Sequence, residues 1–164
     1  LTLTPLVGAI AAGNCALLKP SELSNAVSLA LKDILPQYID ETCFKIVLGG
    51  VPETQALLRV RFDYIFFTGS TGVGRVIAAA AAKHLTPCTL ELGGKSPVYV
   101  HDDLSESKRR TVVKRILWGK MANAGQTCVA PDYLLVHKSA KNQLTGLIKD
   151  VYNEFYNDKQ NEFK

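Results

Sequence analysis

The stretch DYIFFTGSTGVGRVIAAAAAKHLTPCTLEL, residues 63–92, contains the alternation that decides the fold of this chain. Its apolar run at 63–67 predicts a buried strand that ends at the glycine-rich turn Gly69–Gly74. The alanine-rich run at 73–83 predicts a helix. A second apolar run at 86–90 predicts another strand. Strands that alternate with helices at such short spacing lie parallel and are joined by crossover helices.

Predicted strands and helices also alternate before residue 63. It predicts helices at 5–13, from a cap at Ser21 or Ser24 to about 34, and at 52–58, with strands at 15–18 and 44–48. We therefore expect an α/β fold, a doubly wound parallel sheet of Rossmann-like type. Sheets of this type bind ligands at the carboxyl ends of their strands. Lys19, Gly50, Gly69 and Glu91 all follow predicted strand ends, so we expect one crevice to collect them.

The spacing of the predicted strands and helices changes after Gly94. Beyond it we expect strands at 97–100 and 133–137 and helices at 105–121 and 141–156, with a cysteine-containing loop between 121 and 133. We predict a domain boundary near residue 95. Residues 1–95 would form a nucleotide-binding part, and residues 96–164 would begin a second α/β domain, truncated here, whose polar last eight residues, 157–164, fray.

Composition excludes several functions. The 164 residues are 47% hydrophobic, which supports a globular core, and 19 basic against 15 acidic residues give a net charge of only +4. The densest basic run, Lys108–Arg110 with Lys114 and Arg115, falls on a predicted amphipathic helix and is interpreted as its solvent-facing side. Without interleaved aromatic residues or a binding motif, it does not predict a nucleic-acid partner.

The cysteines and histidines show no metal-ligand spacing, so we expect no metal site. Cys15, Cys43 and Cys88 lie in or beside apolar runs and are expected to be buried free thiols, which fits a reducing compartment. The apolar first 18 residues are interrupted by proline, glycine and asparagine and lack a basic leader, so they predict no targeting or transmembrane segment. The chain also opens at Leu1 within an apolar pattern, which suggests a piece of a longer protein.

Two short segments carry the strongest chemical signal. The segment 90–97, LELGGKSP, places the Glu91 carboxylate on a glycine-rich turn, and the segment 123–128, NAGQTC, flanks the thiol of Cys128 with small and polar residues. A cysteine nucleophile needs a route to the thiolate and a base for a later hydrolytic step. Together the two segments favour covalent catalysis.

Two other segments suggest nucleotide binding, each with a structural alternative. Gly69–Gly74 has the order GxxGxG rather than the dinucleotide fingerprint, so it is either a tight strand-to-helix turn or an anion site at a helix start. Lys19 and Glu22 could contact a ribose or phosphate, or they could simply open a helix with an acidic first turn.

Four segments in the same order, Lys19–Glu22, Phe67–Gly74, Glu91–Pro97 and Gly125–Cys128, resemble the signature segments of the aldehyde dehydrogenase superfamily. Longer runs, including 125–133, are similar to its class 3 branch, which contains the fatty aldehyde dehydrogenases. The resemblance covers nearly all of residues 1–156.

The resemblance implies a role for each matching residue. Cys128 matches the nucleophile of the family, and Glu91 matches its general base. Lys19 and Glu22 match residues that bind the adenosine ribose of the cofactor. The other matching cofactor-binding residues are Gly69 and Ser70 at the pyrophosphate, Gly74 in the same loop, and Leu92 at the nicotinamide end. Because the carboxylate of Glu22 repels a 2′-phosphate, NAD is expected, although NADP is possible. Asn123 is not the oxyanion asparagine of the family, which belongs to an earlier segment.

The implied activity is NAD(P)-dependent oxidation of an aldehyde, aliphatic, fatty or aromatic, to a carboxylic acid through a cysteine thiohemiacetal and thioester. The full-length parent is expected to be a homodimer, cytoplasmic or associated with a membrane from its cytosolic side, and this chain by itself to be inactive. Two alternatives remain: a non-catalytic product that binds a nucleotide or a partner protein, and a thiol esterase that uses Cys128 without a cofactor.

Overall fold

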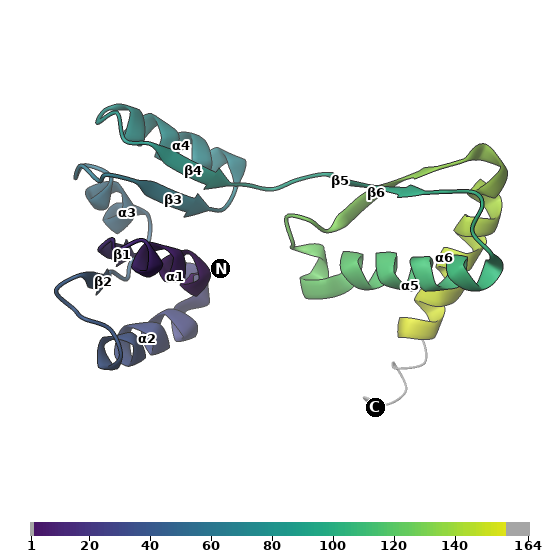
Figure 1. Ribbon diagram of the computed structural model, residues 1–164, viewed down its shortest axis with the longest axis horizontal. Helices are drawn as coiled ribbons and strands as arrows, with labels where there is room; N and C mark the ends of the chain where they lie inside the picture. Colours follow the sequence, from purple (N-terminus) through teal and green to yellow (C-terminus); the bar gives the residue numbers. More distant parts are fainter. Residues whose placement is uncertain (1, 157–164) are drawn as a thin grey trace. The chain divides into compact units, whose positions relative to one another are not determined.

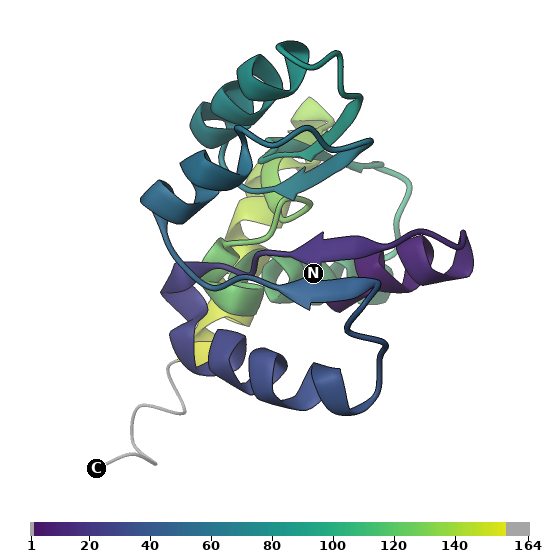
Figure 2. The ribbon, with the colours of Figure 1, turned by 90° about the vertical axis from the view of Figure 1, so that its left-hand side faces the viewer.

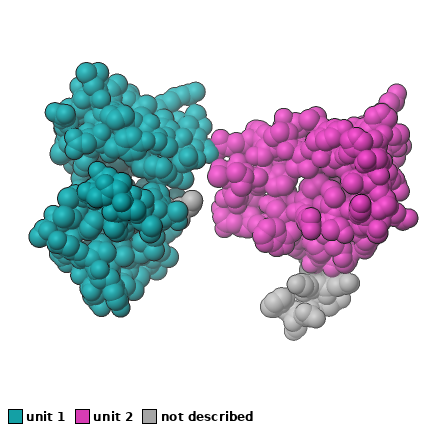
Figure 3. Space-filling model, in the orientation of Figure 1, with its two compact units in different colours: residues 1–92 teal, residues 93–164 magenta. Residues whose placement is uncertain are grey.

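The computed structural model describes residues 2–156, and the chain divides into two compact units, residues 1–92 and 93–164 (Figure 3). The division falls between Leu92 and Gly93. The assignment of nucleotide binding to residues 1–95 and of catalysis to residues 96–164 stays a prediction. The expected fraying of residues 157–164 lies outside the described residues.

Unit 1 alternates short strands with helices (Figures 1 and 2). Its elements are α1 (Leu3–Ala11), β1 (Ala16–Leu18), the 3-10 turn η1 (Glu22–Ser24), α2 (Asn25–Ile34), η2 (Leu35–Gln37), β2 (Phe44–Ile46), α3 (Val51–Leu57), β3 (Ile65–Thr68), α4 (Thr71–Ala82) and β4 (Cys88–Glu91). Helix α4 packs against β3 and β4, which it connects. Every helix and strand expected in this part of the sequence is present.

The strands of unit 1 pair in parallel, which confirms the predicted α/β class. Strand β1 pairs with β2, with Ala16 opposite Phe44, and β3 pairs with β4, with Thr68 opposite Glu91. Within residues 2–156 these are separate two-stranded pairs rather than one continuous sheet. Each strand has only three or four residues, so each pair has few ladder hydrogen bonds.

Serine caps fix where two of these helical segments begin. The hydroxyl of Ser21 accepts a hydrogen bond from the Leu23 amide at 3.3 Å, so the serine cap belongs to η1, and α2 begins only at Asn25. The Ser70 hydroxyl accepts from the Val73 amide, also at 3.3 Å. Helix α4 therefore begins at Thr71, two residues before the predicted start.

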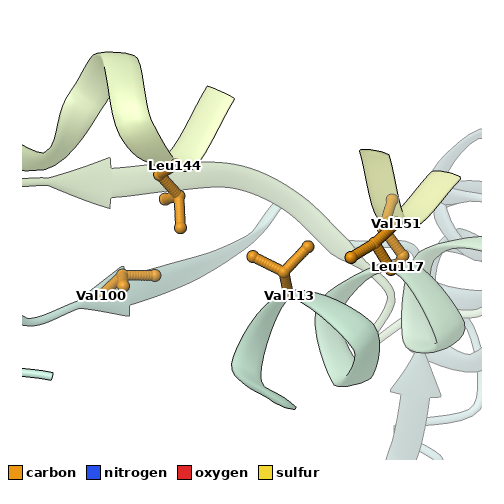
Figure 4. Packing of buried hydrophobic residues seen from close by; sticks show 5 residues of the cluster. All are labelled: Val100, Val113, Leu117, Leu144 and Val151. Atoms are coloured by element: carbon orange, nitrogen blue, oxygen red, sulfur yellow. The ribbon is translucent and has the colours of Figure 1, made fainter. Parts of the chain in front are cut away.

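Unit 2 places two long helices beside one parallel strand pair (Figure 1). Its elements are β5 (Ser96–Val100), α5 (Glu106–Met121), η3 (Ala122–Gly125), β6 (Pro131–Val136), η4 (Lys138–Ala140) and α6 (Lys141–Tyr156). Its core joins one strand to both helices through Val100, Val113, Leu117, Leu144 and Val151 (Figure 4). Val113 and Val151 are completely shielded from solvent.

The basic run on α5 is only partly the solvent-facing side that the sequence predicted. Lys108 and Arg115 are exposed. Arg109, in contrast, is half-buried, because its guanidinium donates to the Asp102 carbonyl at 2.7 Å and to the side chain of Gln143. Here the prediction was wrong: Arg109 ties the start of α5 to the start of α6.

The neighbouring cations of α5 also face α6. Arg110 and Lys114 each lie 2.6 Å from a carboxylate oxygen of Glu154. The hydrogen bond from Lys114 is the main cause that lowers the pKa of Glu154. One carboxylate of α6 therefore compensates part of the local positive charge. No helix among residues 2–156 is both long enough and apolar enough to cross a membrane.

Replacing Leu144 with alanine should destabilise unit 2 by about 2–5 kcal/mol, because Leu144 is only 3% exposed and its removal leaves a cavity between α6 and α5. Hydrogen–deuterium exchange of the α5 and α6 amides would measure the effect. Leu23→Ala is the matched control, since Leu23 is 92% exposed and should cost little. Equal exchange in the two variants would contradict the assignment of this core.

Candidate active site

An unusual backbone turn leads to the candidate nucleophile. Asn123, Ala124 and Gly125 have φ angles of 52°, 56° and 76°, three left-handed residues in succession. Glycine adopts this conformation freely, but for asparagine and alanine it costs conformational free energy. Strained residues of this kind are concentrated at functional sites. The Asn123 side-chain amide donates to the Gln126 carbonyl at 3.2 Å, and the Gln126 amide donates to the Asn123 carbonyl at 3.1 Å. These two bonds hold the turn closed.

Cys128 follows this turn and is exposed, so its thiol is accessible to a small electrophile. The next turn is closed by a 3.0 Å hydrogen bond from the Ala130 amide to the Thr127 carbonyl. On its other side the loop touches Gly94, where a Cβ atom would lie 3.0 Å from the Cys128 carbonyl oxygen. A side chain at this position would press on the backbone of the Cys128 loop, which would have to shift by a few tenths of an ångström.

Parallel pairing of β5 with β6 explains why these two segments meet. Ser96 at the start of β5 lies opposite Pro131 at the start of β6, so the residues that precede both strands lie at one edge of the pair. An ion pair reinforces this edge, with Lys95 Nζ 3.2 Å from Asp132 Oδ1. Lys120, at the end of α5, lies 3.7 Å from the same oxygen.

Glu91, the candidate general base, ends β4 in unit 1. It is exposed, so its carboxylate is accessible to water. Its backbone is fixed, because its carbonyl accepts a 3.0 Å hydrogen bond from the Gly69 amide. Gly94, which packs against Cys128 in unit 2, comes three residues after Glu91 in the sequence.

The loop from Gly69 to Gly74 presents an anion-binding arrangement different from the expected one. The Gly69 amide is used by Glu91, and the Ser70 hydroxyl caps the Val73 amide. The first amides of a helix have no partner within the helix, so those of Thr71 and Gly72 at the start of α4 are the donors left for a phosphate. Both residues lie at the helix start that the sequence indicated as a possible anion site, but neither was named individually, although the serine cap directly before them was a usable signal.

Gly74 and Leu92 contact each other rather than facing a ligand side by side. Gly74 is buried, and a Cβ atom there would lie 2.8 Å from Cδ2 of Leu92. The structure therefore gives Gly74 a helix-to-strand packing contact, the role of a small residue in a close approach. Its predicted participation in cofactor binding stays a prediction, as does that of Leu92.

Lys19 and Glu22 lie together beyond the end of β1. Lys19 Nζ donates to the Gly49 carbonyl at 2.8 Å and to the Pro20 carbonyl at 3.1 Å, and it lies 3.5 Å from the Glu22 carboxylate. An ammonium has three hydrogens, so all three are engaged and the bond to Glu22 is the longest. The Lys19 side chain is 19% exposed and that of Glu22 is 49% exposed. Glu22 is thus the more available acceptor for a hydroxyl.

Local interactions lower the pKa of Glu22, first through a hydrogen bond from its own backbone amide and then through the charge of Lys19. A carboxyl with a lowered pKa contributes stability above its ordinary value of 4.5 and loses that contribution as the pH falls through the folded pKa. The Glu22 carboxylate therefore stays charged to a lower pH than an isolated glutamate does.

The expected crevice of Lys19, Gly50, Gly69 and Glu91 is present only as two local groups in unit 1. Lys19 lies with Glu22 and Gly50 beyond β1 and β2, and Gly69 lies with Glu91 beyond β3 and β4. A single crevice that joins both groups stays a prediction.

Two of the three histidines contact residues of their own turns. His137 accepts from the Ser139 amide as the cap of η4, and His101 Nδ1 lies 2.8 Å from Asp103. Within residues 2–156 no group of three or more histidine, cysteine or acidic side chains is arranged for a metal ion.

The four cysteines are free thiols, but one expectation about their burial was wrong. Cys43 and Cys88 are half-buried, whereas Cys15 is exposed. Cys15 lies in the turn that precedes β1, since the strand begins only at Ala16.

Comparison with known proteins assigns the class. The model of the aldehyde dehydrogenase family matches residues 1–162. Aldehyde dehydrogenase family 3 member B1 of Rattus norvegicus is 56% identical over 158 residues, which make up 96% of this chain and 33% of the rat protein. The substrate-bound structure of Staphylococcus aureus AldH superposes with a TM-score of 0.83 at 46% identity, covering 94% of this chain and 33% of that one.

A Mycobacterium tuberculosis aldehyde dehydrogenase complexed with NAD+ superposes with a TM-score of 0.72 at 30% identity, covering 82% of this chain and 28% of that one. These likenesses define an oxidoreductase fold of the α/β class. The chain belongs to the aldehyde dehydrogenase family, and it is similar to family 3 members in particular. It spans about a third of the length of the relatives it matches.

Gly94→Ala should loosen the Cys128 loop, because the added methyl group meets a backbone oxygen that cannot rotate away. Overpacking of this kind costs about 1–3 kcal/mol. The Ala130 amide should then exchange with deuterium roughly 5- to 150-fold faster. Gly93→Ala is the matched control, since nothing lies within 4 Å of a Cβ atom there. Similar exchange in both variants would refute the close approach.

Proposed function

We propose that this chain supplies the nucleophile, the general base and the nucleotide-binding residues of an NAD-dependent aldehyde dehydrogenase that converts an aldehyde to a carboxylic acid. The observation that carries the proposal is the exposed Cys128 on a strained left-handed turn, in a chain whose family is established by nearly its whole length. As its substrate we propose an aliphatic, fatty or aromatic aldehyde, the class that the resemblance of the sequence implies; the match to a family 3 aldehyde dehydrogenase supports an aldehyde in general.

The residues of unit 1 fit a dinucleotide. The half-exposed Glu22 carboxylate can accept hydrogen bonds from a ribose, and Lys19 beside it can donate if it releases its long bond to Glu22. The Thr71 and Gly72 amides at the start of α4 can bind pyrophosphate, with Ser70 holding the turn. Gly69 contributes by its small size, since its own amide is used by Glu91.

Cys128 would act first. Its thiolate attacks the aldehyde carbon, and the oxyanion that forms needs hydrogen-bond donors, of which the Cys128 backbone amide can be one. The nicotinamide, when bound, supplies the hydride acceptor that allows the cysteine adduct to become a thioester. Glu91 then takes a proton from water, and the resulting hydroxide hydrolyses the thioester and frees Cys128.

For the 164-residue chain alone we propose little or no turnover. The chain spans about a third of its relatives, and apolar side chains on two strands are open to solvent, Leu17 of β1 by 40% and Phe66 of β3 by 48%. Strands of doubly wound sheets are normally covered on both faces, and a substrate channel needs that cover to exclude water. At the full length of the relatives, we propose a homodimer.

The roles of Cys128 and Glu91 can be tested in a chimera in which this chain replaces the matching 158 residues of the rat B1 relative. Aldehyde-dependent NADH formation should fall by roughly 10³-fold or more in Cys128→Ala. In Glu91→Gln the acyl thioester should accumulate, so mass spectrometry should find an acyl group on Cys128.

Cys15→Ser is the matched control, because it also removes an exposed thiol and should keep the activity. Turnover that survives Cys128→Ala would sink the proposed mechanism. Ester hydrolysis that needs Cys128 while aldehyde oxidation is missing would favour the esterase alternative. NAD binding by the chimera without turnover of either kind would favour a non-catalytic binding protein.

Cofactor choice should depend on Glu22. Its carboxylate repels a 2′-phosphate, so kcat/KM with NAD should exceed kcat/KM with NADP. Glu22→Gln should lower the ratio of these two values by about tenfold. Steady-state kinetics of the same chimera with both cofactors would measure it. Glu53→Gln, which removes another carboxylate from unit 1, should leave the ratio unchanged. A clear preference of the unsubstituted chimera for NADP would contradict this prediction.

A further inference from the structure

Two cysteines far apart in the sequence are neighbours at the amino end of the β1–β2 pair. The register places Ala16 opposite Phe44, so Cys15 and Cys43 occupy the preceding pair of positions. A 2.9 Å hydrogen bond from the Ala16 amide to the Cys43 carbonyl extends the pairing to this point. Side chains at matching positions of neighbouring parallel strands project on the same side.

The register brings the two thiols close together. A hydrogen bond with the Cys43 thiol is the main cause that raises the pKa of Cys15 above its usual value, and the nearby Asp40 carboxylate adds to the effect. Neighbouring strands lie about 4.8 Å apart, within the range of about 4.4–6.8 Å that a disulfide spans between Cα atoms. A bond between the sulfurs therefore needs little backbone movement.

Ordered turns hold both residues in place. Asp40 Oδ1 accepts hydrogen bonds from the Thr42 amide at 2.8 Å and the Thr42 hydroxyl at 2.7 Å, which fixes the turn directly before Cys43. On the other side, helix α1 ends at Ala11 and is followed by Gly13, a left-handed residue with φ 74°, two positions before Cys15. Cys15 is exposed, so a soluble oxidant can reach the pair.

We propose that Cys15 and Cys43 form a reversible intramolecular disulfide in the presence of a peroxide. One thiolate attacks the peroxide O–O bond, which gives a sulfenic acid and releases water or an alcohol. The second thiol then displaces the hydroxyl group of the sulfenic acid as water. Two thiols lose two electrons and two protons, and the peroxide is reduced.

The disulfide would close a loop from residue 15 to residue 43 that contains Lys19 and Glu22. These two residues lie beyond the carboxyl end of β1, and the cysteines lie before its amino end, so the bond would join β1 and β2 at the edge opposite the ribose-binding residues. Cross-linking such a loop restricts the unfolded chain, so oxidation should stabilise unit 1.

The experiment uses the full chain with Cys128→Ala as background, so that the exposed loop thiol does not react. After treatment with hydrogen peroxide, a non-reducing peptide map should contain one linked peptide that joins Cys15 to Cys43. The thermal midpoint of unfolding should rise, and dithiothreitol should reverse both changes. Added Cys15→Ser or Cys43→Ser should abolish the link and the rise, whereas added Cys88→Ser, which removes a thiol on β4, should leave both intact.

Separate sulfinic acids at Cys15 and Cys43 with no linked peptide would overturn the proposal. So would a linked peptide that joins two molecules, which a mixture of ¹⁴N- and ¹⁵N-labelled chains would reveal by its mixed mass. Thermal unfolding of the two serine variants under reducing conditions separates loss of the disulfide from loss of folding. A midpoint close to that of the reduced background shows that the fold is kept.

Discussion

Parallel pairing of very short strands is the constraint on which the rest of this structure depends. A parallel partner is reached only through a crossover, and the two strands of a pair then start at one edge and end at the other. In unit 2 this brings the Gly93–Lys95 segment to the Cys128 loop, because both precede paired strands. In unit 1 it brings Gly69 to Glu91, because both lie where β3 and β4 end. The candidate catalytic residues are thus placed by strand register.

Rigidity around Cys128 comes from the surrounding backbone more than from side-chain burial. The left-handed residues Asn123 and Ala124 each carry a conformational cost of about 1–3 kcal/mol, which persists only when neighbouring structure enforces it. Helix α5 supplies that enforcement at one end, with Val113 and Leu117 buried against α6 and β5. Strand β6, which follows the Cys128 loop, holds the loop in place at its other end. The thiol itself stays exposed, as a nucleophile that must meet a substrate requires.

Periodicity predicted the helices and strands well, because short apolar runs and capping serines are local signals. It could not show that Arg109 would turn inward, since the acceptors on Asp102 and α6 are supplied by the tertiary fold. The left-handed turn before Cys128 could not be predicted either, because asparagine and alanine adopt a positive φ less readily than glycine does. Glu91 and Cys128 were found from their motifs, and their roles remain predictions. The helix start was predicted as a possible anion site, but Thr71 and Gly72 were not named, because only the structure shows that the Gly69 amide is already used.

That last hydrogen bond has a mechanical consequence. The Gly69 amide belongs to the turn that would bind pyrophosphate, and its acceptor is the carbonyl of Glu91. The loop and the backbone of Glu91 are therefore linked by a hydrogen bond that extends the pairing of β3 with β4. If a nucleotide binds at the start of α4, this hydrogen bond is one route by which a shift of the loop would reach the backbone of Glu91, while the carboxylate keeps its own side-chain rotations.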